Sequence, residues 1–129
     1  MKAERFAIWY LRIALGAAFL SAVISRLHAG SKSFAHFLEY TAQVNSFLPA
    51  ATIPYLAWAA TIAETTLGIL LIAGLWPRII ALAAAILLAL FGTAMAISFG
   101  IKEPLDYSVF SASAGALLLA FQTPERRSA

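Results

Sequence analysis

The chain has 129 residues, of which 62% are hydrophobic and 12% are charged, and its formal net charge is +3. This composition lies far outside the usual range of soluble proteins and places the chain among integral membrane proteins, with room for about four spans in a single domain, residues 1–129. Because it contains no cysteine, a disulfide framework, a CxxC redox pair, a thiolate nucleophile and a cysteine-ligated iron–sulfur cluster are excluded.

The first apolar segment covers residues 6–27 and follows a short basic start. It carries Arg12 and is longer than the apolar region of a cleavable signal peptide, so we expect it to remain as the first membrane-spanning helix. Residues 31–48 are less apolar, and one face of the helix that they would form is polar: His36, Glu39, Tyr40 and Gln43. This pattern predicts a short amphipathic helix that lies in the membrane interface between the first two spans.

Residues 54–76 are an apolar run broken by one ionisable residue near its middle, Glu64. As a helix this run would be about 33 Å long, enough to cross a hydrocarbon core of about 30 Å. Residues 79–99 form a third span without a charge, and residues 105–122 form a fourth. The five prolines fall at the gaps between these segments, as expected of residues that interrupt helices: Pro49, Pro54, Pro77, Pro104 and Pro124. The sequence therefore predicts an all-α, integral membrane four-helix bundle with an interfacial helix.

The basic residues set the expected orientation. With both termini inside, the inner segments hold more of them than the outer segments, which hold Lys32 and Lys102, with Arg26 at a span end. The inner set is Lys2, Arg5, Arg78, Arg126 and Arg127. The positive-inside rule then predicts a multi-pass protein of the cytoplasmic membrane with both termini in the cytoplasm. Nucleic acid is not an expected partner because these charges are scattered. No metal site is expected either, because His28 and His36 are eight residues apart.

A carboxylate in the middle of a span costs a few kcal/mol unless it faces the protein interior and has a partner. Glu64 lies between Ala60 and Gly68 on a ridge of small residues, and the first span carries a similar ridge at positions 14, 18 and 22. Counted from the inner ends of the spans, Glu64 lies at a depth of about 18 Å, Arg12 at about 9 Å and Arg26 at about 30 Å. Arg12 is therefore the first choice of partner and Arg26 the second.

In these features the chain resembles the DoxX family of small bacterial membrane proteins, from Leu11 to Ala120. The most specific parts of the resemblance are the LRIALG motif of residues 11–16, the Ala63-Glu64 pair followed by Gly68, and then Gly74 and Arg78. The family is similar to the small membrane subunits of thiosulfate:quinone oxidoreductase and to the methylamine utilisation protein MauE, and other relatives act as assembly factors. The resemblance thus implies redox or maturation work in the bacterial inner membrane. MauE-type work is linked to disulfide formation, in which a chain without cysteine cannot take part directly.

Arg12 and Glu64 admit two main interpretations. They could form a structural ion pair that fixes helix register, or a quinone and proton site in which Glu64 exchanges the proton while Arg12 keeps it charged or polarises a ring carbonyl. Ion transport is a third alternative. The candidate contacts of a bound quinone, the one cofactor considered, are Phe19, Trp58, Thr93 and Ser111.

Two classes of function follow. One is the membrane subunit of a quinone-linked oxidoreductase complex, whose catalytic partner subunit is encoded separately. The other is a non-enzymatic membrane assembly or scaffold factor for a partner protein.

Overall fold

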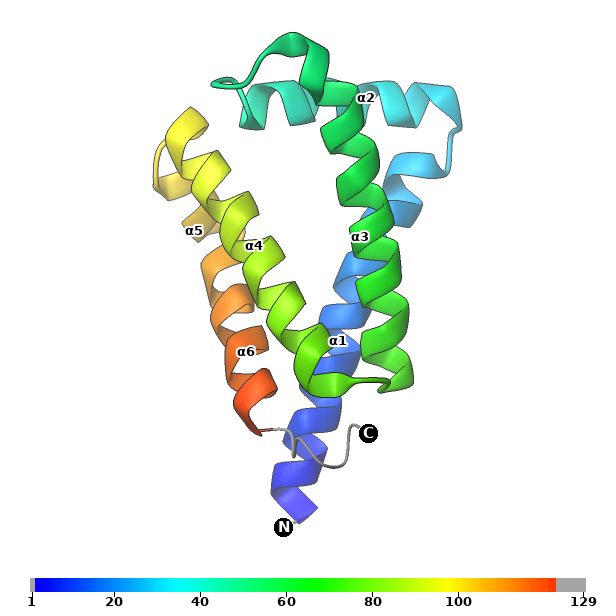
Figure 1. Cartoon of the computed structure of the whole chain (residues 1–129), viewed down its shortest axis with the longest axis vertical. Coiled ribbons are helices and arrows are strands. Elements are labelled where there is room, and N and C mark those ends of the chain that lie inside the picture. Colours follow the sequence, from blue (N-terminus) through cyan, green and yellow to red (C-terminus); the bar gives the residue numbers. More distant parts are fainter. Residues whose placement is uncertain (1, 123–129) are drawn as a thin grey trace.

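The computed structural model describes residues 2–122, and the regular elements in this range are helical. Helices α1, α3, α4 and α6 run along the long axis of the molecule, and α2 lies across one end of them (Figure 1). The bounds in chain order are α1 (Lys2–Leu27), α2 (Ser31–Val44), the 3-10 turn η1 (Ala50–Thr52), α3 (Ile53–Ala73), α4 (Pro77–Phe99), α5 (Lys102–Asp106) and α6 (Val109–Gln122). The expected all-α fold is confirmed for this part of the chain.

Three of these helices are long and apolar enough to cross a membrane: α1, η1 together with α3, and α4. Helix α6 is apolar but has only 14 residues, or about 21 Å. The expected fourth segment begins later than the apolar pattern does, because the chain turns after α5 and Ser108 has a φ of 59°. Arg126 and Arg127, on which part of the expected orientation depends, lie outside the described residues.

The second long helix ends three residues before the end of its apolar run. Gly74 adopts a φ of 78°, and the N–H groups of Gly74 and Leu75 both donate to the carbonyl of Leu70, at 2.9 and 3.2 Å. This left-handed ending favours glycine, which has no Cβ to clash. Pro77 is the first residue of α4. Proline is suited to this position because a backbone N–H in the first turn, which proline lacks, would have no acceptor within the helix.

Helices α1 and α3 approach each other at a pair of glycines. A Cβ on Gly16 would lie 2.8 Å from the carbonyl oxygen of Gly68, and one on Gly68 would lie 3.1 Å from that of Gly16. Close backbone approach of this kind is what small residues provide between membrane helices. The expected ridge at positions 14, 18 and 22 is wrong as the packing face, because Ala14 and Ala18 are exposed and the buried face is centred on Gly16.

Helices α4 and α6 form a second close pair. The small residues Ala81 and Ala85 of α4 are buried, and the ring of Phe110 covers Gly92, where a Cβ would lie 2.8 Å from it. The hydroxyl of Ser113 donates to the carbonyl of Ala85 at 2.7 Å. The small residues of α4 thus pack against α6, and the glycine of α3 packs against α1. Helices α3 and α4 diverge from the turn between them toward α2 (Figure 1).

Candidate functional site

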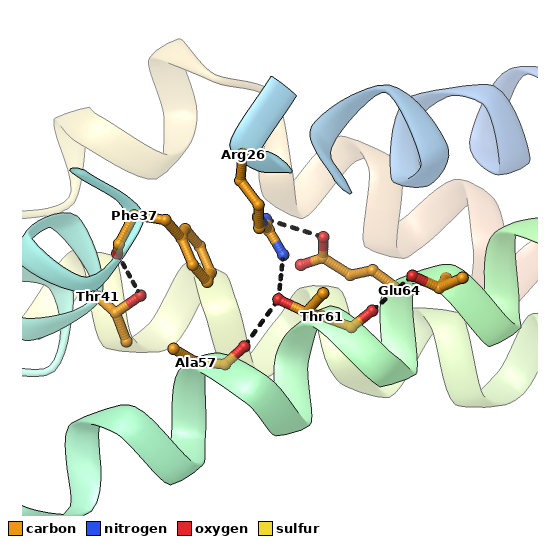
Figure 2. A network of polar contacts seen from close by, with 7 residues as sticks. Arg26, Phe37, Thr41, Ala57, Thr61 and Glu64 are labelled. Carbon is orange, nitrogen blue, oxygen red and sulfur yellow. Dashed lines mark hydrogen bonds and ion pairs between the residues drawn. The ribbon is translucent and has the colours of Figure 1, made fainter. Parts of the chain in front are cut away.

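The last turn of α1 brings a cation to the carboxylate in the middle of α3. Nη2 of Arg26 lies 3.0 Å from Oε1 of Glu64, and the two side chains are only 9% and 5% exposed. Figure 2 shows the guanidinium reaching down from the end of α1 to the carboxylate. The second-choice partner of Glu64 is therefore the one that the structure confirms.

Two further helical positions hold the guanidinium in place. Its Nη1 donates to the hydroxyl of Thr61 at 3.0 Å, and that hydroxyl donates in turn to the carbonyl of Ala57 at 2.8 Å (Figure 2). From the other side, the ring of Phe37 in α2 lies under the guanidinium, with its centroid 3.6 Å from the central carbon. Arg26 thus connects α1, α2 and α3 through an ion pair, a hydrogen bond and a cation–π contact.

Arg12, the expected first choice, does not reach Glu64. Its Nε donates to the carbonyl of Leu71 at 2.9 Å, and its Nη2 donates to that of Ile72 at 3.2 Å. These carbonyls belong to the last turn of α3, where no backbone N–H of the same helix is left to donate to them. The negative end of the helix dipole lies at the same place. Arg12 is therefore a cap for the C-terminus of α3.

The register of α1 against α3 explains this exchange of roles. With Gly16 and Gly68 at one level, Arg26 lies six residues, or about 9 Å, beyond the level of Glu64. Arg12 lies eight residues, or about 12 Å, to the other side. Arg26 is therefore nearer to the level of Glu64 than Arg12 is. Depths counted from the ends of the predicted spans give the opposite result, because α1 begins at Lys2 and projects past the end of α3 (Figure 1).

A cavity of about 690 Å³ lies beside the ion pair, walled by α1, α2, α3 and α4 with a small contribution from α6. Its volume is in the range of small-molecule sites. Arg26 and Glu64 both line it, together with Tyr40 and Thr41 of α2 and Asn45 directly after this helix, and most of the remaining wall is apolar. The wall of the cavity is therefore polar near α2 and the ion pair, and apolar elsewhere.

The four expected quinone contacts are not gathered in one place. Phe19 lines the cavity and is 5% exposed. Trp58 is 51% exposed and stacks on Phe34 instead, with ring centroids 4.6 Å apart. Thr93 is exposed and its hydroxyl donates to the carbonyl of Ala89 in its own helix at 2.8 Å. Ser111 is exposed and does not belong to the wall of the cavity.

The polar groups at the ion pair are not all hydrogen-bonded. Nε of Arg26 is buried and makes no hydrogen bond with any residue in the range 2–122. Oε1 of Glu64 is also buried, and in the same range its partner is Nη2 of Arg26 at 3.0 Å. A buried polar group without a hydrogen bond costs about 1–3 kcal/mol. Neighbouring protein atoms cover both of these atoms, so a head group in the cavity meets other atoms of the two side chains that line it. The pair as a whole is electrically neutral.

Tyr40 lies at the rim of the cavity on α2 and in contact with Phe99, at 6.3 Å between ring centroids. Burial raises the pKa of Tyr40, and the negative charges of Glu103 and ionised Tyr107 raise it further. This phenol therefore stays protonated to higher pH than a free tyrosine.

Among the described residues there is no group of three histidine, aspartate or glutamate side chains that could hold a metal ion. The Nδ1 atom of His28 lies 2.9 Å from the carbonyl of Ser25, and His36 lies 3.6 Å from Glu39 at the surface.

Comparison of the sequence with models of known protein families gives a match. The model of the family described as methylamine utilisation protein MauE matches residues 4–108, which is most of the chain. The comparisons with curated proteins and with solved structures each find no match. The matched range contains Arg12, Arg26 and Glu64, and it ends just before α6.

Proposed function

This chain belongs to the MauE family of methylamine utilisation proteins, and we propose that it is the membrane subunit of a quinone-linked redox system whose partner protein carries the substrate chemistry. The family shown is related to the expected DoxX family, and membership of DoxX itself is not shown. In this proposal α1, α3, α4 and the shorter α6 form a four-helix membrane bundle, and α2 lies in the interface. Both termini lie in the cytoplasm of a bacterial cell.

The observation that carries the proposal is the incompletely hydrogen-bonded ion pair in the wall of the cavity. Ionisable residues inside a membrane protein are costly and tend to mark function. An uncharged quinone head suits this neutral pair of one strong donor and one carboxylate. A carbonyl oxygen of the quinone accepts from a guanidinium, a hydroxyl of the reduced quinol donates to a carboxylate, and neither charge is left without compensation.

When bound, a quinone supplies an acceptor for two electrons and two protons. In this proposal the electrons come from the partner protein. The chain's own contribution is the handling of protons and charge. The Glu64 carboxylate takes up one of the two protons from water and passes it to the quinone, and the second proton also comes from water. Arg26 stabilises the carboxylate that is regenerated.

A second candidate is a membrane assembly factor that prepares a partner protein in methylamine utilisation. The observation in its favour is that Arg26 joins three helices at once, as a purely structural ion pair would. In this case Glu64 and Arg26 matter for the abundance of the protein and not for any redox step.

The experiment that tests the proposal asks what the protein carries out of the membrane. The full chain is purified in mild detergent, extracted with organic solvent, and its quinone content per protein is measured. We expect wild type to retain quinone and Arg26→Lys to lose most of it, because lysine keeps the charge but not the forked donors. Arg12→Lys is the matched control and should retain it. Wild-type protein without quinone would contradict the proposal and leave the assembly factor.

A further inference from the structure

We propose that the cavity takes an uncharged amphiphile with a long apolar tail, and that this molecule enters sideways from the bilayer between α3 and α4. The inference rests on the site of the proposed function and deepens it by naming the route and the tail. It stands on four features: a second hollow, the packing of the helices, the depth of the opening and the balance of charge.

A second hollow of about 470 Å³ lies between α3 and α4 alone. Ala63, Leu87 and Leu90 line both this hollow and the main cavity, so these three side chains lie between the two spaces, and we call them the portal. Leu90 is 62% exposed, and Ile86 beside it is also exposed. The portal therefore leads from the main cavity to the outer surface of the helices.

The portal follows from how the helices pack. The small residues of α4 are covered by α6, and the glycine of α3 is covered by α1, so neither helix has a close-packing face left for the other. On the side facing the cavity, α3 presents Ala59, Ala60 and Ala63, which are too small to fill the space. Where α3 and α4 diverge in Figure 1, two hollows with shared lining residues lie between their side chains.

The depth of the portal decides what can pass through it. Glu64 lies eleven residues after Ile53 and nine before Ala73, so it and the neighbouring Ala63 are at the middle of α3. If α3 spans the bilayer, that level is hydrocarbon, where an apolar chain can lie and a polar solute cannot. The tail of the ligand therefore occupies the portal, and its head lies inward, at the ion pair and the polar end of α2.

The balance of charge selects the head group. Arg26 is already compensated by Glu64, so an anionic head would meet the carboxylate and a cationic head would meet the guanidinium. An uncharged head that both donates and accepts hydrogen bonds avoids both conflicts. Lipids with a charged phosphate head are disfavoured for the same reason.

A photoreactive probe tests the portal without any assumption about quinone. The probe is a long-chain alcohol with a diazirine near the end of its tail, added to the purified full chain in lipid nanodiscs, and the labelled residues are mapped by mass spectrometry. We expect saturable labelling at residues 62–66 and 86–90. The same tail on a phosphate head should give no saturable labelling there.

Two plugging variants and one control make the test specific. Ala63→Phe fills the junction from α3, and Leu87→Trp fills it from α4, so each should abolish the saturable labelling. Ala17→Phe adds the same ring to an exposed position on α1 that lines neither hollow, and labelling should persist.

Labelling that spreads evenly over the outward faces, or that survives both plugs, would overturn the portal. Equal labelling by the phosphate probe would overturn the uncharged head. If the alcohol labels the portal while no quinone is found in purified protein, the proposed function fails and the portal stands.

Discussion

Removing Arg26 should damage the fold through Glu64, and the size of that effect can be worked from its contacts. Arg26→Met keeps most of the apolar stem but deletes the ion pair with Glu64, the hydrogen bond to Thr61 and the cation–π contact with Phe37. Removing one partner of a buried ion pair costs about 3–5 kcal/mol, because the other charge stays buried without compensation. Glu64→Gln alone should cost less, about 1–3 kcal/mol, because the amide still accepts a hydrogen bond from the guanidinium.

The double variant is the informative one. With a neutral glutamine at position 64, Arg26→Met no longer leaves a buried carboxylate without compensation. The double variant should therefore lose about 2 kcal/mol less free energy of unfolding than the two single variants lose in sum. The assay is unfolding in mixed micelles with increasing SDS, followed by circular dichroism. Arg12→Met is the matched control, because within residues 2–122 Arg12 donates hydrogen bonds to α3 carbonyls, and its effect should add to that of Glu64→Gln within about 0.5 kcal/mol. Additive effects at Arg26, or coupling at Arg12, would refute the assignment of the pair.

Three further predictions concern packing, topology and pH. Gly16→Ala should cost about 1–3 kcal/mol by forcing α1 from α3, whereas Gly115→Ala, whose Cβ would lie 3.5 Å from the nearest atom, should be neutral in the same assay. A periplasm-active reporter fused after the last residue should be silent and one inserted at Lys102 active; the reverse pattern would overturn the orientation. Absorbance titration should show one phenol, absent in Tyr40→Phe, that ionises above the usual range near pH 10. Because the folded state binds this proton more tightly than the unfolded state, its contribution to stability is present below pH 10 and lost as pH rises further. A Tyr40→Phe difference spectrum with an ordinary midpoint would contradict the raised pKa of Tyr40.

The helical fold was accessible from the sequence because it depends on local pattern. Apolar runs interrupted by proline and glycine place α1, α3 and α4, and they do so because a helix in lipid satisfies its own backbone. The end of α3 was harder to place, since Leu75 and Trp76 continue the apolar run after Gly74 has already ended the helix. Hydropathy measures what lipid accepts, whereas the helix end is set by backbone conformation.

Only part of the site could be predicted from the sequence, for a related reason. A buried carboxylate requires a partner, so Glu64 predicts an arginine, but the choice between Arg12 and Arg26 depends on the sliding of α1 along α3. That register is fixed by the contact of Gly16 with Gly68, which neither helix reveals alone.

Rotation about the helix axes was equally hidden from the sequence. The positions of Thr93 and Ser111 along their predicted spans indicate depth in the membrane, but depth does not say which way a side chain faces. Conversely, Phe37 and Tyr40 of α2 reach the ion pair and the cavity because α2 lies across the open end of the bundle. No periodicity within residues 31–48 indicates which of the other helices this segment covers.

The central claim is that Glu64 handles a proton for a bound quinone, and the most direct measurement is partner-dependent quinone reduction in membranes, normalised to the amount of this protein. Glu64→Gln keeps the shape and a hydrogen-bond acceptor but cannot exchange the proton. We expect it to insert at near-normal levels and to lose the normalised activity. Glu39→Gln, the same change at a side chain that is 76% exposed, should retain it. Full normalised activity in Glu64→Gln would contradict the claim and would leave Arg26 and Glu64 as a structural pair.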